Sequence, residues 1–221
     1  HGEVARAMWQ PLFGTEVDEV PITHVTNGVH VPTWLGPEMK AVLDRHLGER
    51  WLDATADPAT WVAVEEIPDD ELWAARSAGR HRLVEFIRQR SAADRLRRGE
   101  DIGYAEAAAV GFDPDRLTVG FARRLATYKR LHLLTLEPHR GVQLLTGDES
   151  LQFVFAGKAH PLDEEAKRIL QRTFELKGAP AVADHVAFLE DYDLSFAGLL
   201  VAGCDVWVNL PRPPEEASGT S

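Results

Sequence analysis

The second half of the chain alternates short apolar runs with longer amphipathic stretches. Four apolar runs are expected to form buried strands, over residues 117–122, 151–156, 185–189 and 205–209. The stretches between them suit helices, which we expect to begin near Thr127 and to span about 163–177 and 193–202. Strands that are apolar on both faces and alternate with helices are typical of βαβ units. The pattern therefore predicts an α/β fold, a parallel sheet with flanking helices.

The first half of the chain is predicted to be mainly helical. A short helix is expected over residues 3–9, a second over 37–47, and one long helix over 69–98. Asp69 is the expected N-cap of the long helix, because a short carboxylate can accept from the first free N–H groups. Residues 99–115 are predicted to form a loop and a turn that lead into the first strand.

Composition narrows the classes of partner. The net charge of −11 argues against nucleic acid and against an anionic membrane, since both need a broad basic surface. No run approaches ~18 apolar residues, so no transmembrane helix is predicted. The single cysteine, Cys204, cannot form an intramolecular disulfide, which fits a reducing, cytoplasmic location. The histidines show no metal-ligand spacing. An anion bound by this protein must meet a local basic cluster.

Such a cluster follows the first predicted strand. Ligands of parallel α/β sheets bind at the carboxyl ends of the strands. Four cations fall within eight residues at this point: Arg123, Arg124, Lys129 and Arg130. A helix that begins near Thr127 would add free N–H groups and a dipole that favour a phosphate. The alternative is a solvated basic turn that makes surface ion pairs. Charge and position leave both interpretations open.

The loops after the other strands carry weaker signals. Residues 216–220 offer small side chains and one carboxylate for sugar hydroxyls, although an ordinary loop has the same composition. Lys158 is interpreted as an ion-pair partner rather than a Schiff-base lysine. Asp193 is the expected N-cap of the last helix. Tyr192 either faces the cleft or packs in the ordinary way.

A turn is predicted near the start of the chain, over residues 26–30. Asn27 can exchange hydrogen bonds with a sugar hydroxyl, but it can equally form a structural Asx-turn. His30 can act as a general acid or base, while a hydrogen-bonded loop histidine is the simpler interpretation. The residues of this turn alone do not decide between these alternatives.

Five segments, in register along nearly the whole chain, resemble the glycogen/maltodextrin phosphorylase family and match its bacterial α-glucan branch best. They are residues 1–4 with 26–34, 123–130, 156–159, 188–192 and 216–220. The resemblance implies two Rossmann-like lobes in the GT-B arrangement, with the active site between them. It implies an enzyme that cleaves α-1,4-glucan ends with inorganic phosphate and releases glucose 1-phosphate. It also implies pyridoxal 5'-phosphate, which works through its own phosphate group.

The resemblance also implies domain limits. Residues 1–35 would end the N-terminal lobe and form the junction, residues 36–115 would be a helical connecting region, and residues 116–221 would be the Rossmann-like core. The cofactor lysine of the family would lie beyond Thr220, after the last residue of this chain. We therefore expect this stretch alone to be inactive. A homo-oligomeric parent enzyme is compatible with the resemblance.

Residue roles carry over by motif position. Arg124 and Lys129 would hold the substrate phosphate. Arg123, Tyr192 and Thr220 would contact the cofactor. The terminal glucose would meet Asn27, Glu216, Ala217, Ser218 and Gly219.

Two rival functions use the same residues. A nucleotide-sugar-dependent glycosyltransferase of the same architecture would use the cations for a diphosphate leaving group. A glucan-binding remnant would keep the sugar contacts without catalysis. Position 30 is His where animal enzymes of the family carry a hydroxyl residue, so His30 receives no role.

Overall fold

The computed structural model describes residues 2–25, 28–148, 151–177, 181–212 and 216. Its centre is a four-stranded parallel sheet with the order β3-β2-β1-β4. The strands are β1 (Thr118–Ala122), β2 (Gln152–Ala156), β3 (Val186–Leu189) and β4 (Val206–Trp207). The sequence prediction of an α/β fold with a parallel sheet is confirmed.

The strand order places the topological switch point of the sheet between β1 and β4. The chain runs from β1 to β2 to β3 in one direction, and then crosses back to add β4 on the other side of β1. The connections therefore diverge between β1 and β4. In open α/β sheets the ligand crevice lies at such a switch point, outside the carboxyl ends of the strands. Residues that follow Ala122 and Trp207 are the ones that this topology brings to the crevice.

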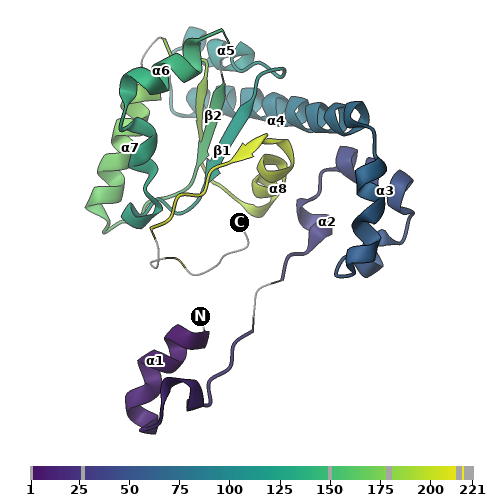
Figure 1. Cartoon of the computed structure of the whole chain (residues 1–221). Helices are drawn as coiled ribbons and strands as arrows, with labels where there is room; N and C mark the ends of the chain where they lie inside the picture. Colours follow the sequence, from purple (N-terminus) through teal and green to yellow (C-terminus); the bar gives the residue numbers. More distant parts are fainter. Residues whose placement is uncertain (1, 26–27, 149–150, 178–180, 213–215, 217–221) are drawn as a thin grey trace.

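The two faces of the sheet are covered by different helices. The helices α4 (Asp69–Arg97) and α8 (Leu194–Gly203) pack on one face, and α6 (Pro138–Thr146) and α7 (Glu164–Lys177) pack on the other (Figure 1). Alternation along the strands explains the division. Ala122, Ala156 and Leu189 face the α4 side, whereas Phe121 and Phe155 face the α6 and α7 side.

Small residues let α8 approach closely. A Cβ at Gly203 would lie 2.4 Å from the Cβ of Leu83 on α4, and one at Gly120 would lie 2.4 Å from Cys204 Sγ. Larger side chains at these glycines would push α8 away from α4 and from the sheet. Burial raises the pKa of the Cys204 thiol to about 12, so this cysteine is a packing residue rather than a nucleophile.

The first half of the chain contributes further helices, and the apolar core around α3 (Pro37–Leu47) packs against Leu72 and Ala75 of α4. The helices are α1 (Gly2–Phe13), α2 (Val31–Trp34) and α3, followed by the 3-10 helices η2 (Trp51–Ala54) and η3 (Pro58–Glu66). A short 3-10 turn, η1 (Val17–Glu19), follows α1, which lies apart from the other helices (Figure 1). Trp51 and Trp61 meet edge to face at 5.5 Å within the core of α3, η2 and η3. Among the described residues, no helix is both long and apolar enough to span a membrane.

The structure corrects two of the predicted loops and helices. Residues 99–115 contain a helix, α5 (Ile102–Val110), which Asp101 caps by accepting from Gly103 N at 2.8 Å. No continuous helix starts near Thr127. Instead, η4 (Thr127–Lys129) and η5 (Leu131–Thr135) are separated by Arg130, whose φ of 54° is left-handed, and α6 begins only at Pro138.

Two smaller predictions also change. Asp69 is the first residue of α4 rather than its cap, because Pro68 holds the N-cap position. The fourth strand is Val206–Trp207, shorter than the expected 205–209. The long helix itself is confirmed, and Asp193 caps α8 as expected by accepting from Phe196 N at 2.8 Å.

Candidate anion-binding site

The basic loop after β1 is anchored to the loop after β2. The backbone N–H of Arg123 donates to Ala156 O at 3.2 Å, and that of Leu125 donates to Lys158 O at 3.0 Å. Gly157 lies between these two contacts with a φ of 144°, and a Cβ there would lie 2.0 Å from the Arg123 carbonyl oxygen. Only glycine fits this approach. The position of the first cation in the loop is therefore fixed by backbone contacts.

Two cations of this loop converge on one carboxylate. Arg123 and Lys129 both form ion pairs with Oε1 of Glu216, and Arg123 also donates to the side-chain oxygen of Asn209. Lys129 is 5% exposed. A buried ammonium needs an anionic partner, and here Glu216 supplies it. The segment after β4 and the segment after β1 thus meet at the switch point of the sheet.

The second carboxylate oxygen of Glu216 differs from the first in its hydrogen bonding. Its Oε2 is buried and has no hydrogen-bond partner among the described residues. A buried carboxylate oxygen without a donor costs free energy, because it has lost its water. A ligand hydroxyl would restore the missing hydrogen bond. The site therefore presents both cations and an acceptor toward the crevice.

Arg124 and Arg130 play different parts. Arg124 is exposed and makes no hydrogen bond or ion pair with the described part of the chain. Arg130 donates from Nε to Leu210 O at 2.7 Å and from Nη2 to Pro211 O at 3.3 Å. The backbone N–H of Arg212 donates to Tyr128 O at 2.9 Å. Arg130 therefore joins the loop after β1 to the segment after β4, whereas the exposed guanidinium of Arg124 is available to a ligand.

The expected helix dipole does not contribute to this site. The loop contains only a three-residue 3-10 turn, Thr127–Lys129, and α6 starts eight residues after Arg130. Its N–H groups are thus remote in sequence from the cations. An anion here would be held by side chains, with Arg supplying a planar fork and Lys a compact charge.

Tyr192 approaches from the loop after β3. Its ring packs edge to face on Phe196 of α8, with ring centroids 5.5 Å apart. Burial raises the pKa of the Tyr192 phenol, while the positive charge of Arg123 lowers it. The loop after β3 thus supplies a third contribution to the same region.

Other expected residues lie elsewhere or outside the described part of the chain. Asn27 and residues 217–220, which include Ala217, Ser218, Gly219 and Thr220, are not among the described residues. Lys158 pairs with Asp191 at 3.2 Å, which confirms the ion-pair interpretation. His30 Nδ1 and Thr33 Oγ1 are 2.8 Å apart, as expected for a hydrogen-bonded loop histidine.

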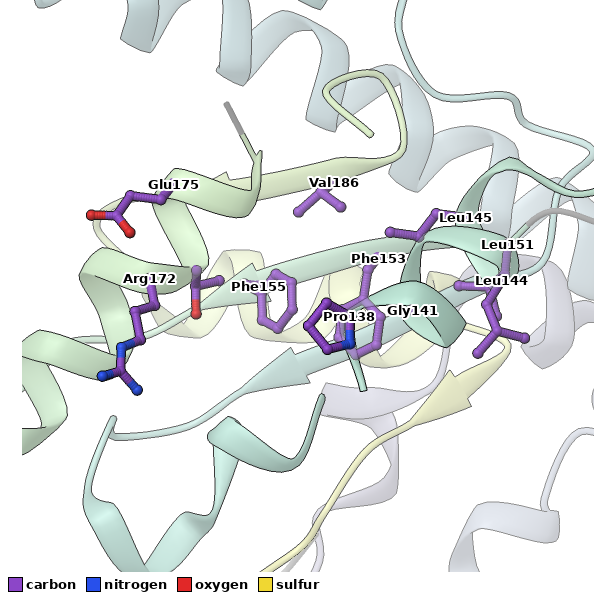
Figure 2. A pocket seen from close by; sticks show the side chains of 11 residues that line it. Pro138, Gly141, Leu144, Leu145, Leu151, Phe153, Phe155, Arg172, Glu175 and Val186 are labelled. Carbon is purple, nitrogen blue, oxygen red and sulfur yellow. The ribbon is translucent and has the colours of Figure 1, made fainter. Parts of the chain in front are cut away.

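An apolar cavity of about 430 Å³ lies away from this cluster, between α6, α7 and β2 (Figure 2). Phe153 and Phe155 line it, and its charged lining residues are Arg172 and Glu175. Such a lining offers no concentrated positive charge for a phosphate. Among the described residues, no group of three His, Cys, Asp or Glu side chains is arranged to hold a metal ion. The cationic cluster is therefore the candidate site.

A parallel α/β sheet with flanking helices, whose cations gather at the switch point, places the fold in the Rossmann-like class. A sequence profile of the carbohydrate phosphorylase family matches residues 15–221. The chain belongs to this family.

Named relatives match the chain over its whole length. The glycogen phosphorylase of Aquifex aeolicus is 40% identical over all of this chain and 32% of its own length. The glycogen phosphorylase of Mycobacterium tuberculosis is 44% identical and the maltodextrin phosphorylase of Thermococcus litoralis is 39% identical, each over 26% of its own length. The chain thus spans between a quarter and a third of these relatives.

Proposed function

We propose that the chain forms the phosphate-binding part of the active site of an α-1,4-glucan phosphorylase. The observation that carries the proposal is the convergence of Arg123 and Lys129 on the Glu216 carboxylate at the switch point, with exposed Arg124 next to Arg123 in the chain. The relatives that match the whole chain are named glycogen and maltodextrin phosphorylases. Such an enzyme would release glucose 1-phosphate from glucan ends with inorganic phosphate. We propose a two-lobe GT-B arrangement in which residues 1–35 end the N-terminal lobe and form the junction, while the rest of the chain belongs to the C-terminal lobe.

Arg124 and Lys129 are the proposed ligands of the substrate phosphate. A phosphate at pH 7 needs fixed positive charge in a site that partly excludes water. Lys129 is already buried, so its charge acts at low effective dielectric. Arg124 is exposed and can close on a bound anion with two parallel hydrogen bonds. The Glu216 carboxylate is the anion that contacts Lys129 in this structure. We propose that a bound phosphate replaces it there.

The residues also fit a second phosphate, that of pyridoxal 5'-phosphate. Arg123 is nearly buried and is bonded to a carboxylate, and Tyr192 is half-buried within range of its charge. We propose that Arg123, Tyr192 and Thr220 hold the cofactor. When bound, the cofactor would supply a phosphate group that exchanges a proton with the substrate phosphate. Two phosphates repel each other, so the role of this chain is to offset their charge with Arg123, Arg124 and Lys129.

The glucan would lie next to the phosphate. The terminal glucose is proposed to contact Asn27 and the loop of Glu216, Ala217, Ser218 and Gly219. The buried Oε2 of Glu216, which has no donor among the described residues, supports this part of the proposal. A glucose hydroxyl is a donor of the right kind for it.

A chimera tests the proposal. This chain replaces the matching segment of Aquifex aeolicus glycogen phosphorylase, and the rest of that protein supplies the missing parts. The chimera is incubated with maltodextrin, inorganic phosphate and pyridoxal phosphate, and glucose 1-phosphate is measured. We expect turnover, and we expect Arg124→Met in the chimera to lower kcat/KM by about a hundredfold. Arg172→Met is the matched control, because Arg172 lies on α7 beside the apolar cavity.

Two results would count against the proposal. One is a folded chimera, with a cooperative melting transition, that forms no glucose 1-phosphate but transfers glucose from a nucleotide sugar. The other is an Arg124→Met chimera as active as its Arg172→Met control. The chain without the rest of the relative is expected to form no glucose 1-phosphate.

A further inference from the structure

The turn after β3 has an unusual backbone. Asp191 has a φ of 53°, in the left-handed region that residues with a side chain adopt at a cost. Tyr192 follows it directly, and Asp193 then caps α8. A conformation of this kind persists only where the surroundings enforce it. The question is which contacts hold the turn.

One side of the turn is held by the end of α4. Arg98 donates from Nη1 to Glu190 Oε1 at 2.5 Å and from Nε to Glu100 Oε1 at 2.6 Å. Arg97 lies 3.9 Å from the other oxygen of Glu190. Arg98 thus bridges two carboxylates with two nitrogens of one planar group, which fixes its orientation. Glu190 cannot move without breaking this bridge.

The other side of the turn is held by two further cations. Lys158, from the loop after β2, lies 3.2 Å from Asp191 Oδ1, and Arg90 of α4 lies 3.9 Å from Oδ2. Arg90 is itself oriented by Asp94 at 3.2 Å, and Asp94 is only 3% exposed. Asp94 also pairs with Arg97 at 2.5 Å. One buried carboxylate therefore aligns cations that reach both acids of the turn.

These contacts determine where Tyr192 lies. Its ring rests on Phe196, which stacks on Phe86 of α4 at 5.3 Å, so α4 supports both the turn and the ring. Burial raises the pKa of the Tyr192 phenol, and the charge of Arg123, the cation proposed to face the cofactor phosphate, lowers it. The left-handed turn, the ion pairs and the aromatic support all converge on this single side chain.

We propose that Arg98 is a positioning residue for the anion site: through its ion pair with Glu190 it holds the left-handed turn closed and keeps Tyr192 beside Arg123. Arg98 touches neither substrate nor cofactor in this arrangement. Its role rests on the proposed function only in so far as Arg123 and Tyr192 serve the phosphate site. The placement of Tyr192 itself can be tested without any ligand.

The first experiment titrates the Tyr192 phenol in the 221-residue chain. Because the chain has three tyrosines, Tyr104→Phe and Tyr128→Phe leave Tyr192 as the one phenol to be followed by tyrosinate absorbance. Burial outweighs Arg123 and holds its pKa above the ordinary value. In this background Arg98→Met is expected to open the turn and to move the pKa of Tyr192 down, toward about 10. Arg98→Lys keeps a charge for Glu190 and is expected to restore most of the shift.

Two controls separate positioning from general destabilisation. Arg172→Met removes an arginine of α7 and is expected to leave the Tyr192 titration unchanged. Glu190→Gln breaks the same ion pair from its other end, and it replaces Arg98→Met if that variant does not fold. A pKa of Tyr192 that stays unchanged in both Arg98→Met and Glu190→Gln overturns the proposal, whatever happens to the melting temperature.

Inorganic phosphate supplies the second readout. Calorimetric titration of the chain is expected to show binding that Arg98→Met weakens by about fivefold, the value of one partly exposed ion pair. If the unaltered chain binds no phosphate while the Tyr192 titration shifts as expected, the proposed function fails and the positioning role stands. If the unaltered chain and Arg98→Met bind phosphate equally well, and the pKa of Tyr192 is the same in both, the positioning role fails and the phosphate site stands.

Discussion

The two ends of the sheet use the same residue types to opposite effect. At the amino end, all three guanidinium nitrogens of Arg80 donate hydrogen bonds, to Pro114 O, Asp205 and Ser77. Gln152, which is fully buried, exchanges three hydrogen bonds with Asp113 and Thr118. At the carboxyl end, Arg123 and Lys129 share one oxygen of Glu216, whose other oxygen has no partner among the described residues.

The difference is that Arg80 and Gln152 direct their hydrogen bonds to the backbone and side chains that precede the strands, whereas the two cations at the carboxyl end share a single oxygen. A cavity of about 460 Å³ also opens at the amino end, beside Arg88 and Arg116. There, however, Arg88 donates to Gly111 O and Phe112 O, and Arg116 contacts His185 Nδ1 at 3.0 Å. These arginines fix the backbone before β1. At the carboxyl end, two cations share one carboxylate whose second oxygen has no partner among the described residues, and a ligand can use such an arrangement.

The largest effect is expected from breaking the amino-end network. Asp205 accepts from Arg80 Nη1 at 2.8 Å, from Arg76 Nε at 3.1 Å and from the backbone N–H of Thr118 at 2.7 Å. Asp205→Ala leaves Arg80 buried without its carboxylate, which should cost about 4 kcal/mol of unfolding free energy. Urea unfolding measures the loss. Asp115→Ala is the control, since this exposed aspartate pairs with exposed His81, and its loss should stay below about 0.5 kcal/mol. Similar losses of unfolding free energy in Asp205→Ala and Asp115→Ala would contradict the claim that the buried network around Asp205 stabilises the fold.

Lys177 provides the opposite case to Arg80, because its buried charge is expected to destabilise the folded state. It is a buried cation without a carboxylate at ion-pair distance among the described residues, and burial, with Arg95 and Arg98, lowers its pKa to about 8. The unfolded chain holds this proton up to about pH 10.4, so the folded state is penalised by about 3 kcal/mol below pH 8. Lys177→Met should raise the unfolding free energy by about that amount at pH 7. The gain should fade between about pH 8 and 10.4, and a gain that does not depend on pH would contradict the account.

At the carboxyl end, Glu216→Gln should cost less and should be reversible by ligand. The amide keeps a hydrogen bond but removes the charge that balances Lys129, so a loss of about 2 kcal/mol is expected. Inorganic phosphate should restore the stability, because it replaces the missing anion and no longer competes with a carboxylate. Thermal melts with and without phosphate test this, with chloride at equal ionic strength as the control. A variant that phosphate fails to stabilise would argue against an anion site.

The smallest effect on stability is expected for Arg124→Met. Arg124 has no partner in the described part of the chain, so the unfolding free energy should change by less than about 0.5 kcal/mol. Phosphate affinity should nevertheless fall by about tenfold, since a charged donor is lost. Calorimetric titration with phosphate measures this, and Arg124→Lys should recover part of the affinity. A large loss of stability would show that Arg124 is structural, as Arg130 is.

Much of the fold could be predicted because apolar periodicity is local. The runs that end at Ala122, Ala156 and Leu189 have the two-sided burial that marks interior strands. The helix α5 was not predicted because Ile102–Val110 is apolar and alanine-rich except for Glu106, so it shows no amphipathic stripe. Its start could have been found, since Asp101 is a standard N-cap residue.

The site was only partly predictable for a physical reason. Position at a strand end made Arg123, Arg124 and Lys129 candidates, because parallel sheets bind ligands there, and the structure brings Arg123 and Lys129 together on Glu216. The sequence could not show that Arg130 would take a left-handed conformation and bind Leu210 O and Pro211 O, since that contact spans 80 residues. The missing helix at Thr127 follows from the same contact. Long-range hydrogen bonds override local propensity where two loops must meet.

The most direct measurement maps phosphate onto the two ends of the sheet. A ¹⁵N-labelled sample of the chain is titrated with inorganic phosphate, and amide and guanidinium chemical shifts are followed. The account predicts shifts concentrated in residues 123–130 and 209–212, which saturate together and which need about tenfold more phosphate to saturate in Arg124→Met. Shifts concentrated instead at Arg88, Arg116 and His185, or no saturable shifts at all, would contradict it.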